Sequence, residues 1–262
     1  MELSIIIPVY NSELILPKLV QEINKVFINK NIKKELIFIN DYSNDNSWKV
    51  IKKLSKSFNY IKGIDLMNNY GQHNAIAAGL NHALGEYIIM MDDDLQHDPI
   101  YILDILAELK RDFDACYVKY LKRKHVMWKR FLSYINHVSS SYLSNKSIKI
   151  YTSSFKGINK RISYIINRDQ NYEVFLDWLI VENSKKIQTI DILHRKRLEG
   201  KTNYDFKKLI ILWSNMIIKI KPKNKFKILL LSIIKLFIKL IVYKILKKKE
   251  YKEKFLVSEK TF

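Results

Sequence analysis

The stretch Glu86–Pro99, EYIIMMDDDLQHDP, decides the fold. Its apolar run Tyr87–Met91 predicts a buried strand, and three consecutive carboxylates follow at once. Adjacent like charges at the end of a buried strand cost free energy unless a cation lies among them. Because side chains two apart on an extended segment point the same way, Asp92 and Asp94 are expected to face one divalent metal ion, with Gln96 continuing the alternation. The alternative is a solvated acidic turn that caps the following helix.

Hard oxygen ligands of this kind suit Mg²⁺ or Mn²⁺ and leave coordination positions for substrate phosphates. Further apolar runs precede this one, and segments with helical spacing separate them; we expect strands at 3–7, 35–39, 61–66 and 87–91. This alternation predicts an α/β fold with a mostly parallel central sheet and helices on both faces.

A polar cluster follows each of these predicted strands, at residues 8–11, 40–45, 68–73 and 92–96. In parallel sheets, ligands bind beyond the carboxyl ends of the strands, so the clusters are expected to form one site. Neither GxGxxG nor GxxxxGK[ST] occurs, which excludes the dinucleotide fingerprint and the P-loop.

Composition favours a folded protein with an anionic partner. The 262 residues are 48% hydrophobic, and 46 Lys and Arg against 26 Asp and Glu give a net charge of +20. Such a charge suits nucleic acid, an acidic membrane surface or phosphorylated substrates. The single cysteine, Cys116, excludes an internal disulfide and fits a reducing compartment. The N-terminus lacks the pattern of a signal peptide, so a cytoplasmic location is expected.

The segments IIIPVYN, FINDYSNDNS and NNYGQHNAIAAGLNHALGEYIIMMDDDLQHDP together resemble the family 2 inverting glycosyltransferases with a GT-A fold. Within them, the chain is most similar to the polyprenyl-phosphate glycosyltransferase branch, of the dolichol-phosphate mannose synthase type. The likeness is close over residues 3 to about 120, and HRKRLEGKTNY at 194–204 is similar to a second motif of that branch.

The resemblance implies a nucleotide-sugar donor, linked to UDP, GDP or TDP, and a Mg²⁺ or Mn²⁺ ion held by Asp92, Asp94 and Gln96. An acceptor-only carboxylate at Asp41 suits the imide N–H of uracil or thymine, whereas the alternative is a helix cap, a role that Asp45 or Ser47 could fill instead. The substrate-binding residues implied are Pro8, Tyr10, Asn11, Asp41, Gln72, Asp92, Arg197, Lys201 and Tyr204, the last three in a loop that closes over the diphosphate.

The catalytic residues expected by the same resemblance are Asp94, Lys119, Arg130 and Asp177. A fifth strand is expected at 115–118. After it, Lys119 and Arg130 would bind the phosphate of the acceptor, or would instead form a solvated basic loop. The segment KIYTSSFKGINKR departs from the relatives, because it lacks their acidic residue before Ser153. A general base would then be Glu173 or Asp177, although Asp177 could equally stabilise a helix.

The C-terminal region is expected to meet the acceptor lipid. We divide the chain into a catalytic domain, 1–205, and a basic membrane-association region of amphipathic helices, 206–262, whose end from 247 to 262 is expected to fray. The segment 228–246 is 19 residues long but contains three lysines. Each central lysine costs about 2.5 to 3.5 kcal/mol on insertion, so a helix in the membrane interface is favoured over a spanning one. The alternative is packing on the catalytic domain or on a second copy in a homo-oligomer.

The sequence thus predicts an enzyme on the inner face of the cell membrane, acting in cell-surface glycan synthesis. It would move a sugar to a polyprenyl phosphate, or alternatively to a hydroxyl of a lipid-linked glycan. A non-catalytic basic binding protein on the same fold is the alternative from a different class. Nucleic acid is not expected as a partner, because the sheet is predicted to be buried on both faces.

Overall fold

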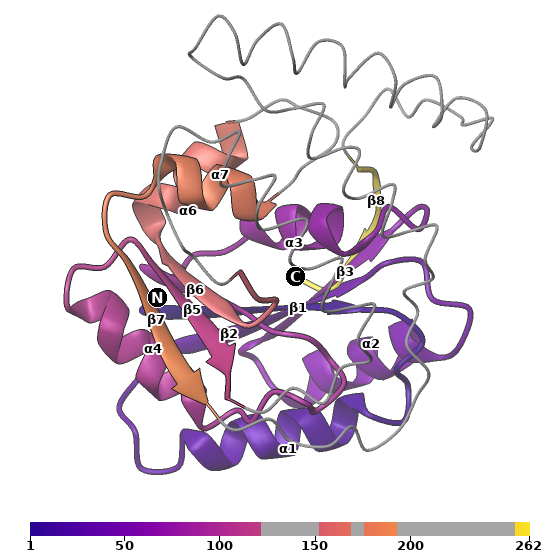
Figure 1. Ribbon diagram of the computed structural model, residues 1–262. Helices are drawn as coiled ribbons and strands as arrows, with labels where there is room; N and C mark the ends of the chain where they lie inside the picture. The colour runs from indigo at the N-terminus through magenta and orange to yellow at the C-terminus, as the bar shows by residue number, and fades with distance from the viewer. Residues whose placement is uncertain (122–151, 169–175, 193–254) are drawn as a thin grey trace, which may run out of the picture. The chain divides into compact units, whose positions relative to one another are not determined.

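The computed structural model describes residues 1–121, 152–168, 176–192 and 255–262 (Figure 1). Its strands join in one sheet of order β7-β5-β6-β4-β1-β2-β3-β8. Their bounds are β1 Leu3–Val9, β2 Lys34–Asn40, β3 Ile61–Leu66, β4 Tyr87–Met90, β5 Ala115–Tyr120, β6 Lys156–Asn159, β7 Ile187–Ile192 and β8 Val257–Lys260.

Helices cover both faces of this sheet. They are α1 Leu16–Val26, α2 Ser47–Ser57, α3 Gln72–Leu80, α4 Tyr101–Lys110, α6 Lys160–Arg168 and α7 Leu176–Asn183. A Cβ atom at Gly79 of α3 would meet Ile6 and Ile39, whereas one at Gly157 would meet α4 and Ile89. Ile89 is paired with Ile5, so it lies on the face opposite to Ile6. The helices α3 and α4 therefore pack on opposite faces, as Figure 1 shows.

The four strands that the sequence predicts up to residue 91 form the parallel centre of the sheet. Strand β1 pairs in parallel with β2 and β4, and β2 pairs in parallel with β3. The leucines and isoleucines of β1 are all fully buried, which explains why this strand is apolar at nearly every position. The expectation of a mostly parallel sheet is confirmed.

The sequence did not predict strands β6, β7 and β8. Strand β6 is antiparallel to both β4 and β5, β7 is parallel to β5 at one edge, and β8 is antiparallel to β3 at the other. The expectation of a frayed end over 247–262 is wrong for its last residues. Trp48 Nε1 donates to Glu259 at 2.7 Å, and the Gly63 amide donates to the Thr261 hydroxyl at 2.8 Å, so the chain end is fixed against α2 and β3.

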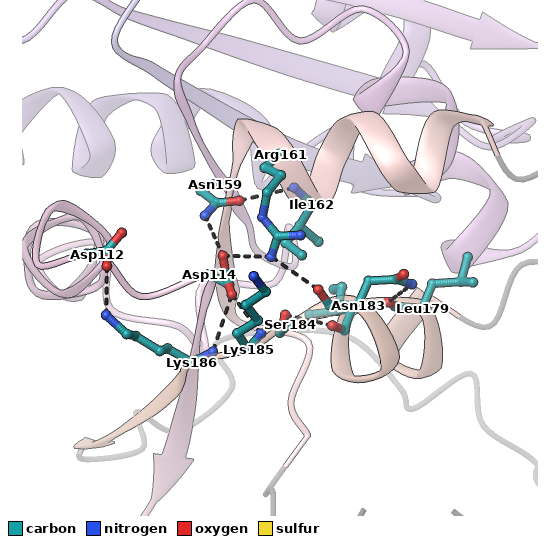
Figure 2. A network of polar contacts seen from close by, with 11 residues as sticks. Asp112, Asp114, Asn159, Arg161, Ile162, Leu179, Asn183, Ser184, Lys185 and Lys186 are labelled. Carbon is teal, nitrogen blue, oxygen red and sulfur yellow. Dashed lines mark hydrogen bonds and ion pairs between the residues drawn. The ribbon is translucent and has the colours of Figure 1, made fainter.

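At the amino end of β5, Asp114 connects four elements (Figure 2). Its Oδ2 accepts the amide hydrogens of Lys185 and Lys186, at 2.7 and 3.2 Å, and its Oδ1 accepts from Asn159 and Arg161, at 2.9 and 2.8 Å. Burial raises the pKa of Asp114, but these hydrogen bonds outweigh it and lower the pKa to about 2. Asp114 therefore acts as a structural carboxylate that joins β5, β6, α6 and the start of β7.

The opposite, carboxyl edge of the sheet carries backbone strain. Asn11, Tyr42 and Leu95, which follow β1, β2 and β4, all have positive φ angles, of 55°, 58° and 59°. This conformation costs roughly 1–2 kcal/mol for a residue with a side chain, most of all for one such as leucine. Asn29 and Asp112, which lie towards the amino edge, also have positive φ, but asparagine and aspartate tolerate this conformation. Tyr42 and Leu95, which tolerate it less well, both follow strands at the carboxyl edge, and this marks that edge as a candidate functional site.

Candidate active site

Asp92 is held in one orientation at the end of β4. Gln72 Nε2 donates to its Oδ1 at 2.6 Å, and the Ser154 hydroxyl and His97 Nε2 donate to its Oδ2 at 2.7 and 3.0 Å. Burial raises the pKa of Asp92, but the hydrogen bonds from His97 and Ser154 and the Lys156 charge outweigh it, and the pKa is lowered. Asp92 is therefore an ionised carboxylate with its geometry fixed from two sides.

Asp93 has different partners from Asp92. Its Oδ2 accepts from the Ser12 hydroxyl at 2.5 Å and from the Tyr10 amide at 3.3 Å. Burial is the main cause that raises the pKa of Asp93, to about 7, with the neighbouring carboxylates Asp92 and Asp94 adding to it. Asp93 thus ties the loop after β1 to the end of β4.

The argument that placed Gln96 by alternation is wrong. Strand β4 ends at Met90, residues 93–95 form a bend, and Leu95 has a positive φ, so the chain is not extended from Asp92 to Gln96. The Gln96 amide donates to Asp94 Oδ1 at 3.1 Å, which closes this turn. The ligand roles of Asp94 and Gln96 stay predictions.

The buried carboxylate of Asp41 fixes the loop before α3. Its Oδ1 accepts the Tyr70 amide at 2.8 Å and its Oδ2 accepts the Gly71 amide at 2.9 Å, where Gly71 has a φ of 84°. Burial raises the pKa of Asp41 to about 6, although the two amide bonds act in the opposite direction. Each oxygen retains a second lone pair for a donor such as a base imide.

Asp41 does not cap α2, because Asp45 has that place. Asp45 Oδ1 accepts the Ser47 amide at the start of α2 at 2.9 Å, and its Oδ2 accepts the Glu13 amide at 3.0 Å. Asp41 is therefore not needed at α2, and it makes its contacts with the loop before α3 instead.

Pro8, Tyr10 and Asn11, the expected nucleotide-pocket residues, lie at the end of β1 beside the end of β2. Pro8 is paired with Ile39 in the sheet. Asn11 donates its amide hydrogen to Ser43 and accepts the Asn44 amide at 2.8 Å. The two loops are thus joined across the carboxyl edge, next to Asp41.

Asp177 lies on α7, where it forms a buried ion pair with Lys156 of β6 and accepts a hydrogen bond from the Tyr117 hydroxyl at 3.1 Å. The Lys156 side chain is 2% exposed. Asp177 is thus the counter-ion of a buried lysine, which supports the structural alternative. Lys119 on β5 is half exposed, and its Nζ lies 3.6 Å from Asp191.

Other expected residues lie outside the described part of the chain: Arg130, Glu173, Arg197, Lys201, Tyr204 and the segment 228–246. The structure instead adds residues that sequence reasoning missed, namely His97, Tyr120, Ser154 and Lys156 around Asp92. His97 follows the acidic run within the same motif, which is the signal that could have identified it.

The structure tests the donor set for a divalent cation. Within the described ranges, no three His, Cys, Asp or Glu side chains converge as a ready metal cluster. Mg²⁺ usually takes one or two carboxylates and completes its shell with water and substrate phosphates, so two aspartates suffice. Asp92 is ionised and already oriented by neutral donors and His97, which is how outer hydrogen bonds hold a metal ligand. The residues present fit the ion.

Comparison with known proteins gives a consistent result. The glycosyl transferase family 2 pattern matches residues 4–165. The chain is 29% identical over 208 residues to the uncharacterized glycosyltransferase YkcC of Bacillus subtilis, covering 79% of this chain and 64% of that protein. It is 28% identical to the undecaprenyl-phosphate 4-deoxy-4-formamido-L-arabinose transferase of Proteus mirabilis, covering 82% and 67%. The chain thus spans about two thirds of the length of these relatives.

Solved structures agree in their fold. S. aureus TarS in complex with UDP-GlcNAc has a TM-score of 0.58 at 18% identity, covering 92% of this chain and 73% of that one. The glucosyl-3-phosphoglycerate synthase of Mycobacterium tuberculosis, with Mn²⁺, UDP-glucose and phosphoglyceric acid, has a TM-score of 0.57 at 12% identity, covering 83% and 77%. At such identities the likeness concerns the fold alone.

Proposed function

This chain belongs to glycosyltransferase family 2, and on that premise we propose that it transfers a sugar from a nucleotide donor to a polyprenyl phosphate at a membrane surface. Its fold is the GT-A fold of glycosyltransferases. Family membership makes the chain an enzyme, so the alternative of a non-catalytic binding protein is wrong.

The observation that carries the proposal is the convergence at the carboxyl edge of the sheet. An oriented, ionised Asp92 ends β4, Asp94 lies in the adjoining bend, and Asp41 lies buried at the end of β2. Asp41 would accept the imide hydrogen of a uracil or thymine base, while Pro8, Tyr10 and Asn11 would line its pocket. Gln72, at the start of α3, holds Asp92 and would lie beside the diphosphate.

Asp92 and Asp94, with Gln96, would hold Mg²⁺ or Mn²⁺. When bound, such an ion neutralises charge on the departing nucleoside diphosphate. In the transfer itself, a phosphate oxygen of the acceptor attacks the anomeric carbon while the bond from that carbon to the donor diphosphate breaks, so the anomeric configuration inverts. The chain's own residues contribute orientation and charge at the carboxyl edge.

A phosphate acceptor is favoured over a hydroxyl by the surroundings of Asp177. A hydroxyl acceptor needs a general base, but Asp177, the one candidate base within the described ranges, is engaged by the buried Lys156 and by Tyr117, and the other candidate, Glu173, lies outside them. A phosphate is already ionised near neutral pH and needs only positioning. Lys119 and, outside the described ranges, Arg130 would supply cations for it. The names of relatives such as the Proteus enzyme agree with a lipid phosphate acceptor.

Membrane association is supported by where the chain carries its charge. The chain has 46 Lys and Arg and 26 Asp and Glu, and the described residues hold 20 of each. The remaining 26 basic and 6 acidic residues, in 122–151, 169–175 and 193–254, therefore account for the whole net charge of +20. Among the residues that the structure describes, no helix is both long and apolar enough to cross a membrane.

The proposal is tested with purified full-length protein, membranes carrying polyprenyl phosphate, and a panel of labelled UDP-, GDP- and TDP-sugars. We expect label from one donor to move into the organic-solvent phase in the presence of Mn²⁺ or Mg²⁺, and mild acid to release it. Acid-stable label would support the glycan-hydroxyl alternative, and no lipid label with any donor would contradict the proposal.

The first prediction concerns Asp94. Asp94→Asn removes a charge from the bend that would bind the cation, so transfer should fall by about 10²-fold or more while the fold is retained. Asp112→Asn is the matched control, because Asp112 is an exposed aspartate paired with Lys186 on the amino side of β5. Transfer at the wild-type rate by the Asp94→Asn enzyme would contradict the site assignment.

A further inference from the structure

We propose that His97 and Tyr120 are positioning residues for Asp92, acting through a hydrogen-bonded chain that runs from the end of β5 to the end of β4. The inference rests on the proposed function, because it concerns the carboxylate that would bind the divalent cation. It adds to that function the groups that determine how tightly the cation is bound.

The chain of contacts is continuous and short. The Tyr120 hydroxyl lies 2.7 Å from His97 Nδ1, and His97 Nε2 lies 3.0 Å from Asp92 Oδ2. With its proton on Nε2, the ring accepts the Tyr120 hydroxyl and donates to Asp92, so both ring nitrogens are satisfied. Tyr120 thereby fixes which ring nitrogen carries the proton that faces the carboxylate.

Packing fixes the ring as firmly as the hydrogen bonds do. The His97 side chain is 5% exposed, and its ring packs edge-on against Phe155 and Tyr120, with centroid distances of 5.0 and 5.9 Å. Rotation of this almost fully buried ring would break two hydrogen bonds. His97 therefore holds Asp92 Oδ2 at a defined position.

The surroundings of His97 indicate that it orients a metal ligand, Asp92, and does more than stabilise the fold. The acceptor of the His97 proton is an aspartate at the strain-bearing carboxyl edge, and the Oδ1 atom of that aspartate is bound only by Gln72 among the contacts the structure gives it. One lone pair on Oδ1 thus stays directed away from His97 and Ser154. Loss of such an outer partner typically weakens metal affinity 10- to 100-fold.

The test measures Mn²⁺ binding by the full-length protein, from the electron paramagnetic resonance signal of free Mn²⁺ with saturating UDP present. His97→Leu should raise the Mn²⁺ dissociation constant about tenfold or more. His97→Gln, which keeps an N–H donor, should recover part of this loss. Tyr120→Phe, which removes only the hydroxyl, should change the constant in the same direction by a smaller factor.

Tyr60→Phe is the matched control, because it removes a hydroxyl bond to Asn24 of α1, 2.8 Å long, away from Asp92. It should leave Mn²⁺ affinity unchanged, even if thermal unfolding by circular dichroism shows a lower midpoint. The Mn²⁺ concentration that gives half-maximal transfer should follow the dissociation constants across the series, with a smaller change in the rate at saturating Mn²⁺.

The outcomes separate this inference from the proposed function. If the wild type binds Mn²⁺ and the folded His97 and Tyr120 variants bind it equally well, the positioning role is wrong and the proposed function stands. The Mn²⁺ affinity could instead fall only in proportion to the midpoint of thermal unfolding, and by as much in Tyr60→Phe as in Tyr120→Phe. In that case the role of His97 and Tyr120 is structural, and the inference is also wrong. If the wild type itself binds no Mn²⁺ with UDP, the metal requirement of the proposed function fails.

Discussion

Aspartates at the carboxyl edge of the sheet differ in charge because their neighbours differ. Burial favours a higher pKa for Asp41, Asp92 and Asp93. It raises the pKa of Asp41 to about 6 and that of Asp93 to about 7. Only at Asp92 do a histidine, a hydroxyl and a nearby lysine outweigh burial and lower the pKa. Asp92 is thus kept ionised where a cation would bind, whereas Asp93 serves as a hydrogen-bonding link to the loop after β1.

The pKa of Asp41 predicts how nucleoside binding depends on pH. Its ionised form would accept the base imide, so the affinity for uridine or thymidine should fall as the pH drops below about 6, by up to about tenfold per pH unit. Nucleosides are used because they lack phosphates that titrate in this range. The measurement is nucleoside titration by nuclear magnetic resonance between pH 5 and 8.

Asp41→Asn is the control for this prediction, and it should bind weakly with no pH dependence between 5 and 8. Folding stability should respond to pH in the opposite sense. Because the folded-state pKa of Asp41 lies above its ordinary value, the folded state takes up a proton, and the cost of burying the charge is relieved as the pH falls below about 6. A wild type whose nucleoside affinity is constant over this range would contradict the assigned contact.

At the scale of elements, Asp114 shows how one carboxylate organises the antiparallel half of the sheet (Figure 2). Its contacts reach Asn159 at the end of β6, Arg161 in α6, and the amides of Lys185 and Lys186 before β7. These contacts join residues 114, 159–161 and 185–186, which are distant in sequence, through a single carboxylate.

Asp114→Asn should therefore destabilise the fold by about 2 kcal/mol at neutral pH, since its pKa of about 2 lies almost two units below the ordinary value. The sign follows from that shift: the stabilisation is complete above about pH 4 and is lost as the pH falls towards 2. Urea unfolding at pH 7 and pH 3 measures it. Asp112→Asn, whose side chain is 87% exposed, should change stability little and so serves as the control.

The edge strand β8 gives a second prediction at this scale. Deletion of residues 255–262 would expose the hydrogen-bonding edge of β3 and remove the Trp48 and Gly63 contacts of Glu259 and Thr261. We expect the midpoint of thermal unfolding to fall by several degrees, equivalent to about 1–3 kcal/mol, with aggregation on heating. Glu259→Gln, which keeps the strand, should have a much smaller effect. An unchanged midpoint in the deletion variant would mean that β8 contributes nothing to stability.

For the whole molecule, the topology determines where the excess positive charge is attached. Strands β5 and β7 end at the carboxyl edge, and strands β6 and β8 begin there. The basic segments 122–151 and 193–254 therefore leave and rejoin the sheet at the edge that carries Asp92. The described part of the chain is itself electrically balanced, so attraction to an anionic surface is expected to act through these two segments.

This arrangement predicts salt-dependent binding to vesicles that contain anionic lipid. Each lysine near such a surface adds roughly 1 kcal/mol, so replacing five of them by glutamine should weaken binding by about 10²-fold or more. The variant changes Lys219, Lys221, Lys223, Lys225 and Lys227. Its matched control changes the exposed lysines of the described part, Lys18, Lys30, Lys33, Lys53 and Lys56.

Vesicle sedimentation at low and high salt measures the binding of both variants. We expect the control to bind nearly as the wild type does, because its lysines lie among an equal number of acidic residues. An equal loss of binding in the two variants would mean that charge acts through the whole surface and that no segment is specialised for the membrane.

The sequence by itself determined the parallel half of the sheet, and it predicted a site beyond the carboxyl ends of those strands. Each central strand is an apolar run followed by a polar cluster, and local periodicity suffices to read both. The family and the acidic motif follow from residues that lie close together in the chain or in a recognisable order, whereas the sequence left open whether Asp41 caps a helix. The predicted role of Asp41 in base binding still awaits its experiment.

Only the tertiary structure decided what surrounds those residues. His97 and Ser154 bind Asp92, and Tyr120 binds His97 from the end of β5. Asp177 of α7 pairs with Lys156 of β6, and the last residues of the chain join β3. Short strands such as β6 and β8, four residues each, have too few positions for a period to be read. Their pairing, like the hydrogen bonds around Asp92, depends on contacts between residues far apart in sequence, and such contacts leave no local pattern.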